Sequence, residues 1–384
     1  MDYIRHTKAL DELYHNLDKM IEKNLFDKKY VVMFGCNKIA GMIIYYLQQK
    51  NIKVNSIVDN NKNNCGQMFM DVLVSAPQEV LGTFRKDVLV LIASGFQAEM
   101  IKQLEDMGYK NNDHIRKVID LPMLMNDYSF VQRDNFEELN RDEVRNSQLR
   151  CLKKVKSICE SNNIRYFLCG GTLLGAARHQ GYIPWDDDID IFIVLKDWEK
   201  FSKLVKENDE FGFISFMGED DYYDDMGLFY DKTNICDANH FPMQTTAGIS
   251  IDVMPLIGLP DTQEAIKEYA MELKNQNSKV QNTLYDLSKC KCERKKLYEL
   301  MLRYDYDTSK NVGHILGPYF MKEVRPKEWF EKTVYLKFED EEYAAPIGYD
   351  NYLRKLYGDY MQLPPEDKRV GHHYFRAYKK KEGL

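Results

Sequence analysis

The sequence predicts an α/β protein of two domains, and two stretches of the chain carry this prediction. Between residues 30 and 107, short apolar runs of strand length alternate with helical segments, which is typical of a doubly wound parallel sheet. Near the middle, residues 164–194 place a glycine pair at a helix start, just ahead of an acidic strand. A chain of 384 residues exceeds the usual size of one domain, and 44% hydrophobic residues are enough for ordinary cores.

An amphipathic helix is expected first, within residues 1–28. Its apolar residues recur at helical spacing: Leu10, Leu13, Leu17, Met20 and Ile21. The pattern leaves open whether this face packs on the next domain or on a second subunit, so a homo-oligomer is one of two outcomes.

A β-α-β pattern opens the unit predicted over residues 29–125. Its expected elements are a strand over 30–35, a helix over 36–51, a strand ending at Asp59, a short helix over 75–80, a strand over 87–95 and a helix over 97–107. The unit resembles the Rossmann-like modules attached to several sugar-modifying enzymes. Gly35, Gly41 and Asp59 match only part of a nucleotide-binding fingerprint, so ligand binding and a scaffolding role both stay open.

The glycine pair marks the region that carries chemistry. Residues 164–169 (IRYFLC) predict a short strand, and Gly170 and Gly171 then allow a tight turn with close approach of a ligand. From Thr172 the pattern is helical, and a helix start directs free N–H groups and a positive dipole end at a phosphate. These three residues are therefore candidate phosphate ligands.

An acidic strand is expected next, in the segment WDDDIDIFIV. Strand alternation would place Asp186, Asp188 and Asp190 on one face and Asp187 on the other. Carboxylates crowded on one edge repel one another unless a cation lies among them, and oxygen ligands at this spacing suit Mg²⁺ or Mn²⁺.

A further carboxylate, from a second strand, is expected from Asp252, the only charged residue in the apolar segment GISIDVMPLIG. A lone charge in such a run needs a partner. The alternative is that the acidic cluster is a solvated turn and that Asp252 is a structural hydrogen-bond acceptor. The glycine pair, the alternation and Asp252 together favour a metal site.

The same residues resemble a known family. Residues 164–194 are similar to the core signature of the LicD family, bacterial phosphocholine transferases of the nucleotidyltransferase superfamily that also resemble fukutin and fukutin-related protein. Residues 345–373 (APIGYDNYLRKLYGDYMQLPPEDKRVGHH) resemble the C-terminal signature of the family. The resemblance implies an α+β catalytic domain of nucleotidyltransferase fold over residues 126–384.

The resemblance also implies a reaction. A LicD-like enzyme passes phosphocholine from CDP-choline, or another phospho-alcohol from its CDP donor, to a hydroxyl of a cell-surface glycan or a lipid-linked sugar, and releases CMP. Asp188 and Asp190 would hold Mg²⁺ or Mn²⁺ with Asp186 assisting, and Asp252 would complete the metal site or accept the hydroxyl proton. Asp188, Asp190 and Asp252 form the expected catalytic set.

Further candidates would bind the donor. Arg178 either donates two parallel hydrogen bonds to a phosphate or is an ordinary surface cation near a helix C-terminus. Trp185 adjoins the acidic strand and could offer its ring face to choline. The C-terminal motif adds a basic cluster suited to an anionic donor, although its two histidines could equally lie in solvent: Lys368, Arg369, His372 and His373.

Two other functions stay open. A nucleotidyltransferase that attaches a nucleoside monophosphate from an NTP to a small acceptor would share the glycine pair and carboxylates, but it would leave the C-terminal signature unexplained. An inactive binding or scaffold protein of a glycan pathway is the other, and the intact set of aspartates argues against it.

Composition limits partners and location. The net charge of −7 argues against nucleic-acid binding. No apolar run is long enough to cross a bilayer, and residues 1–13 lack a hydrophobic signal core, so a cytoplasmic protein is expected. Residues 379–381 are three lysines that form either a solvated tail or a contact with anionic lipid at the inner face of the membrane. The eight scattered cysteines predict free thiols.

Overall fold

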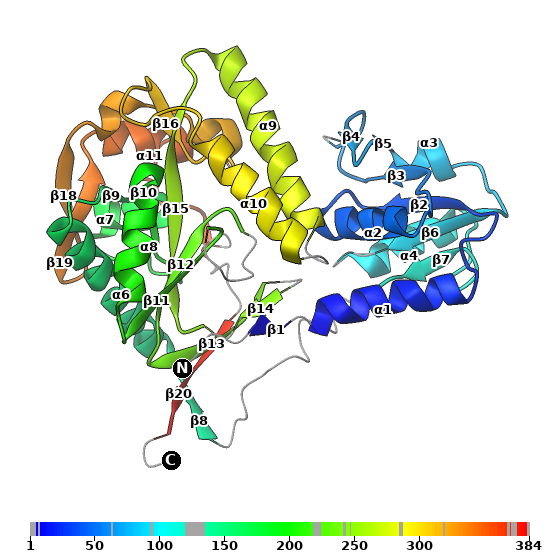
Figure 1. Ribbon diagram of the computed structural model, residues 1–384, viewed down its shortest axis with the longest axis horizontal. Coiled ribbons are helices and arrows are strands. Elements are labelled where there is room, and N and C mark those ends of the chain that lie inside the picture. Colours follow the sequence, from blue (N-terminus) through cyan, green and yellow to red (C-terminus); the bar gives the residue numbers. More distant parts are fainter. Residues whose placement is uncertain are drawn as a thin grey trace.

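The protein is described here from a computed structural model. The residues that it describes are 5–6, 8–62, 64–92, 94, 96–119, 135–217, 224–240, 243–245, 247–283, 287–317, 319–366, 369 and 375–381. Figure 1 shows a smaller N-terminal part (blue to cyan) beside a larger part, with helices α9 and α10 between them. These helices are α9 (Gln263–Asn282) and α10 (Leu287–Met301).

A mainly parallel sheet forms the N-terminal part. Its strands lie in the order β4 (Met68–Phe69), β5 (Val72–Ser75), β3 (Ser56–Val58), β2 (Tyr30–Phe34), β6 (Val88–Ile92) and β7 (Ile115–Lys117). All pairs are parallel except β4 with β5. From β5 onward, the order of the parallel strands is 3-2-1-4-5 by their sequence in the chain, which is the doubly wound arrangement. The predicted α/β class is confirmed.

Helices cover both faces of this sheet, as strands with continuous apolar runs require. The helices are α1 (Lys8–Glu22), α2 (Lys38–Gln49), α3 (Pro77–Leu81) and α4 (Gln97–Asp106). Val31 and Met33 pack in one core with α1 and α2, whereas Val32 and Phe34 pack in a second core with α3 and α4.

Helix α1 packs on the N-terminal sheet. Leu13 and Leu17 have no exposed surface, and the Asn16 amide donates a hydrogen bond of 3.0 Å to the carbonyl of Val118. The Tyr14 ring stacks on Tyr46 of α2 with 4.5 Å between the ring centroids. Between the two alternatives for this apolar face, the structure favours packing within the chain.

A second sheet carries the acidic residues. It runs in the order β11 (Phe211–Ser215), β12 (Gly227–Asp231), β15 (Ser250–Leu259), β10 (Asp190–Val194) and β9 (Tyr166–Leu168), with β16 (Asn311–Gly313) on β15 and β17 (Arg325–Pro326) on β16. Strands β10 and β15 are parallel, and their register sets Asp190 opposite Asp252. The helices packed on this sheet include α6 (Arg141–Ser161), α7 (Gly170–His179) and α8 (Trp198–Lys206).

Two smaller sheets complete the larger part. One has the order β1 (Arg5–His6), β14 (Met243–Thr245), β13 (Asn234–His240), β20 (Phe375–Lys380) and β8 (Phe136–Glu138), and the other is the hairpin of β18 (Thr333–Phe338) and β19 (Glu341–Pro346). Of the two alternatives for residues 379–381, the free solvated tail does not form, because Lys379 lies within β20 and its ammonium is 2.9 Å from a carboxylate oxygen of Glu143.

The apolar spacing within residues 137–159 predicts one long helix, but α6 begins only at Arg141. Asn140 caps it, since its side-chain oxygen accepts hydrogen bonds from the N–H groups of Asp142 and Glu143. Residues 136–138 instead form β8. Among the described residues, no helix combines the length and apolar character needed to span a membrane.

Candidate active site

The glycine pair lies where β9 leads into α7. Gly170 has a φ of +51°, in the left-handed region that favours glycine. A Cβ atom on Gly170 would lie 2.7 Å from Oδ2 of Asp190, and one on Gly171 would lie 2.7 Å from Oδ2 of Asp186. The pair therefore has no space for side chains, because two carboxylates pack directly against its backbone.

The first two N–H groups of α7 already have acceptors. Gly170 donates a hydrogen bond of 2.9 Å to the hydroxyl oxygen of Tyr352, and Gly171 donates to the Asp190 carboxylate. In this structure the pair therefore positions the acidic residues that follow it, and its role in binding phosphate stays a prediction.

Asp190 is the most buried of the acidic residues in this region, with 9% of its surface exposed. Burial raises its pKa well above the usual range, and the charges of Asp188, Asp252 and Asp186 raise it further. Its neighbour across the parallel ladder is Asp252, whose N–H donates a hydrogen bond of 2.8 Å to the carbonyl of Ile189. Paired residues of adjacent strands point to the same face, so the ladder directs both carboxylates together.

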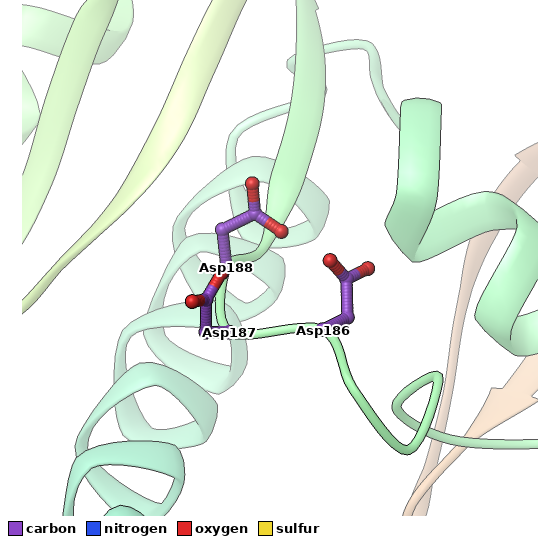
Figure 2. A group of neighbouring side chains, drawn as sticks. All are labelled: Asp186, Asp187 and Asp188. Carbon is purple, nitrogen blue, oxygen red and sulfur yellow. The ribbon is translucent and has the colours of Figure 1, made fainter. Parts of the chain in front are cut away.

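Three further carboxylates gather just before β10. One oxygen from each of Asp186, Asp187 and Asp188 lies within 4.8 Å of the others. Figure 2 shows the three side chains leaving the loop that runs into β10. The predicted strand from Trp185 is wrong here, since β10 begins only at Asp190. Asp187 consequently joins the cluster instead of pointing to the opposite face.

Helix α6 explains why the acidic loop is not a strand. The Arg145 guanidinium donates a hydrogen bond of 2.9 Å to the carbonyl of Asp186, and the Gln148 amide donates one of 2.8 Å to the carbonyl of Asp187. Arg141 donates to the carbonyl of Asp186 at 3.2 Å. These side chains donate hydrogen bonds to backbone carbonyls that would otherwise accept them from a neighbouring strand. These contacts were not predicted from the sequence, although two arginines spaced four residues apart at the start of α6 indicate a basic helix start.

Comparisons with known proteins match both parts of the chain. Residues 163–298 match the family described as LicD/FKTN/FKRP, nucleotidyltransferase domain. The chain carries a LicD nucleotidyltransferase domain. Residues 27–115 match a second family, described as C2185-like, N-terminal.

Individual relatives agree with this assignment. The chain is 29% identical over 264 residues to the lipopolysaccharide cholinephosphotransferase LicD of Haemophilus influenzae, a match that covers 61% of this chain and 97% of that protein. It is 49% identical over 53 residues to the ribitol 5-phosphate transferase FKRP of Homo sapiens, covering 13% of this chain and 11% of that one. The chain is therefore a phosphotransferase of the LicD type.

Two predicted phosphate ligands of the LicD domain have other contacts. The Thr172 side chain is buried, and its hydroxyl accepts a hydrogen bond of 2.8 Å from the N–H of Asp190. Arg178 donates to the carbonyl of Tyr360 at 2.6 Å and to that of Gln362 at 3.4 Å. Thr172 thus positions Asp190, and Arg178 fastens the C-terminal segment to α7, while the role of both residues in binding phosphate stays a prediction.

The C-terminal segment also reaches the acidic loop. The Arg369 guanidinium lies 5.5 Å from the centre of the Trp185 ring, and His179 meets the edge of that ring with 6.4 Å between centroids. The structure thereby brings together two of the predicted donor-binding residues. The other three, Lys368, His372 and His373, lie outside the described residues.

A buried tyrosine contacts the glycine pair, and a buried arginine packs on its ring. Tyr352 belongs to α11 (Tyr349–Tyr357), and its ring lies 3.8 Å from the guanidinium carbon of Arg325. Arg325 is fully buried and forms an ion pair of 2.7 Å with Glu323. The sequence does not predict this role, because nothing in the local pattern of Tyr352 shows that its hydroxyl contacts Gly170, 182 residues earlier.

Proposed function

We propose that this phosphotransferase moves a phospho-alcohol, with phosphocholine favoured, from a CDP donor to a hydroxyl of a cell-surface glycan or its lipid-linked precursor. The observation that carries the proposal is the group of carboxylates at the glycine turn, where Asp190 lies opposite Asp252. The names of two relatives, a cholinephosphotransferase and a ribitol 5-phosphate transferase, support a phospho-alcohol as the transferred group.

In the proposed reaction, the acceptor oxygen forms a bond to the phosphorus that carries the alcohol. The bond from that phosphorus to the bridging oxygen breaks, and CMP leaves with the bridging oxygen and its electron pair. The acceptor hydroxyl must lose its proton. Asp252 is more exposed than its ladder partner Asp190, so we assign proton acceptance to Asp252.

The carboxylates fit a hard divalent cation. They offer only oxygen ligands, and beyond the effect of burial, the charges of Asp188, Asp252 and Asp186 raise the pKa of Asp190. We assign Asp186, Asp188 and Asp190 as the residues that would hold Mg²⁺ or Mn²⁺. When bound, such an ion neutralises charge on the diphosphate during transfer.

Trp185 supports choline as the alcohol. Its ring already lies beside a cation, the Arg369 guanidinium at 5.5 Å, and a quaternary ammonium is attracted to the same ring face. In the proposed complex, choline takes the place of Arg369 on the ring. Arg369 is then free to approach the anionic diphosphate.

The test is release of CMP from CDP-choline by the purified chain, with Mg²⁺ or Mn²⁺ and a panel of sugar acceptors. We expect CMP to form only with the metal and to disappear with EDTA or in Asp188→Asn. Asp340→Asn is the matched control, because Asp340 is an exposed carboxylate whose partner is Lys153 on the surface. That variant should retain the wild-type rate.

Other products would change the proposal in defined ways. Release of CMP from CDP-ribitol or CDP-glycerol, but not from CDP-choline, would replace the alcohol and keep the carboxylate chemistry. Pyrophosphate release from an NTP would establish nucleotidyl transfer instead. A wild-type rate in Asp188→Asn would refute the assignment of this residue.

A further inference from the structure

A basic hollow lies in the N-terminal domain, apart from the carboxylates of the LicD domain. It has a volume of about 710 Å³, within the range of sites that hold small organic ligands. Four cationic side chains line it: Lys29, Lys86, Lys110 and Arg116. Asp113 is the one carboxylate among its lining residues. This concentration of positive charge occurs in a chain whose net charge is −7.

Among the described residues, none of the four cations has a carboxylate oxygen within 4.0 Å of its nitrogens. Lys29 donates to the carbonyl of Lys86 at 3.4 Å. A hydrogen bond from Arg85 lowers the pKa of Asp87, and the charge of Lys29 contributes to this shift. Arg116 donates to the carbonyl of Ile115. Cations that converge on one hollow favour an anion with several oxygens, for which each cation can supply a charge-assisted hydrogen bond.

An aromatic wall stands beside the cations. Phe84 is 44% exposed, and its ring lies 5.3 Å from that of His114 in an edge contact. The Nδ1 atom of His114 accepts a hydrogen bond of 3.3 Å from the N–H of Lys110, so the neutral imidazole carries its proton on Nε2, where it can donate. An exposed ring and a donor next to clustered cations suit a ligand that has both a ring and phosphates.

The hollow lies at the amino ends of the parallel strands. Lys29 directly precedes β2, Lys86 lies two residues before β6, and Arg116 belongs to β7. Ligands of doubly wound sheets usually bind at the opposite, carboxyl edge. At that edge, the Asp59 carboxylate already accepts hydrogen bonds from the N–H groups of Cys36 and Asn61.

From these observations we infer that the amino-edge hollow of the N-terminal domain binds a nucleoside di- or triphosphate. The cations near the amino ends of the strands bind the phosphates of this ligand. Phe84 and His114 contact its nucleobase. This site is separate from the carboxylate cluster and does not depend on the proposed transfer reaction.

Lysine acetylation of the full chain, followed by mass spectrometry, tests the inference at the site itself. The probes are CTP, ATP and inorganic pyrophosphate, each with EDTA present so that metal-dependent binding at the carboxylates is suppressed. We expect CTP or ATP to slow acetylation of Lys86 and Lys110 severalfold and to leave Lys102 unchanged. Lys102 is an exposed lysine of α4 that does not line the hollow.

A charge-reversal pair provides the control. Lys86→Glu/Lys110→Glu should weaken nucleotide binding, measured by calorimetry, by about tenfold or more, because two charge-assisted contacts are replaced by repulsion. Lys62→Glu/Lys102→Glu makes the same change in net charge at exposed positions outside the hollow and should bind like the wild type. Equal melting temperatures of the two double variants exclude unfolding as the cause.

Three results would overturn the inference. The first is unchanged acetylation with every nucleotide at millimolar concentration. The second is protection by pyrophosphate that nucleotides do not improve, since the aromatic wall would then have no role. The third is protection only by vesicles of phosphatidylglycerol and phosphatidylcholine, which would show that the phosphate belongs to a lipid headgroup.

Discussion

Two turns of this chain are built alike and differ in how their charges are balanced. The turn after β2 and the turn after β9 each have a glycine with positive φ, Gly35 at +104° shortly before α2 and Gly170 at +51° as the first residue of α7. In each, a later aspartate accepts an N–H at the helix start: Asp59 from Cys36 at 2.6 Å, and Asp190 from Gly171.

The two turns differ in the groups that surround their aspartates. Asp59 is surrounded by donors, since the N–H groups of Cys36 and Asn61 and the Asn64 amide all reach its carboxylate. Asp190 is surrounded by other carboxylates, which raise its pKa along with burial. The first turn is therefore complete without a ligand, whereas the second would be stabilised by the cation that we propose. Under that proposal, the same local construction serves structure in one domain and chemistry in the other.

The largest expected difference between the turns comes from removing the aspartate charge. Asp190→Asn should lower turnover by about a thousandfold, because loss of one metal ligand removes roughly 4 kcal/mol of transition-state stabilisation. Without metal, the melting temperature of Asp190→Asn should not fall, because the substitution removes a buried negative charge that lies beside other carboxylates. Asp59→Asn should destabilise the fold by about 2 kcal/mol, through weaker hydrogen bonds to a charged group, and leave turnover unchanged.

Steady-state CMP release and denaturant unfolding of both variants measure this contrast. If Asp190→Asn unfolded readily while keeping its activity, Asp190 would have a structural role, and the proposed difference between the two turns would be wrong.

Alanine at the glycines should give the next largest effect. In Gly171→Ala, the new Cβ would lie 2.7 Å from Oδ2 of Asp186, so that carboxylate must move. Displacement of a catalytic group by about 1 Å can cost about a hundredfold in rate. Gly35→Ala meets no such carboxylate, and its nearest contact would be the Asn37 amide at 3.2 Å. Its positive φ should cost about 1 to 2 kcal/mol of stability without loss of turnover.

Activity assays and melting curves of the two alanine variants decide between rate and stability. Equal losses of turnover in both would show that the glycines serve folding alone.

Local sequence patterns predicted the elements but not the contacts between distant ones. The alternation of strands and helices predicted the parallel sheet, because strands covered on both faces need continuous apolar runs. The lone charge of Asp252 predicted a partner, and the register of β15 with β10 places Asp190 opposite it. Both signals are short-range, a few residues long.

The misplaced features depend on tertiary contacts. Asp187 joins the acidic cluster because Gln148 of α6 binds its carbonyl, 39 residues away. Arg178 contacts the carbonyl of Tyr360, 182 residues away, and this contact fastens the C-terminal segment to α7. Strand periodicity and helix propensity contain no information on such pairs, so the strand start and the role of Arg178 could not be predicted from the residues nearby.

The smallest effect tests how each glycine N–H is held. In the first turn, Gly35 donates to the carbonyl of Val58 within its own sheet, at 2.8 Å. In the second, Gly170 donates to the Tyr352 hydroxyl of a remote helix, at 2.9 Å. Tyr352→Phe should therefore cost about 1 to 3 kcal/mol for the unsatisfied N–H and lower kcat less than tenfold.

Tyr269→Phe provides the matched control for this last change. The hydroxyl of Tyr269 donates 2.8 Å to the carbonyl of Leu300, in the contact between α9 and α10. Its loss should cost about 1 kcal/mol without changing kcat. If Tyr352→Phe behaved in the same way in both assays, Tyr352 would be an ordinary core residue. A lower kcat at unchanged KM in Tyr352→Phe alone would show that the remote helix positions the glycine turn, a dependence that the first turn lacks because its hydrogen bonds come from its own sheet.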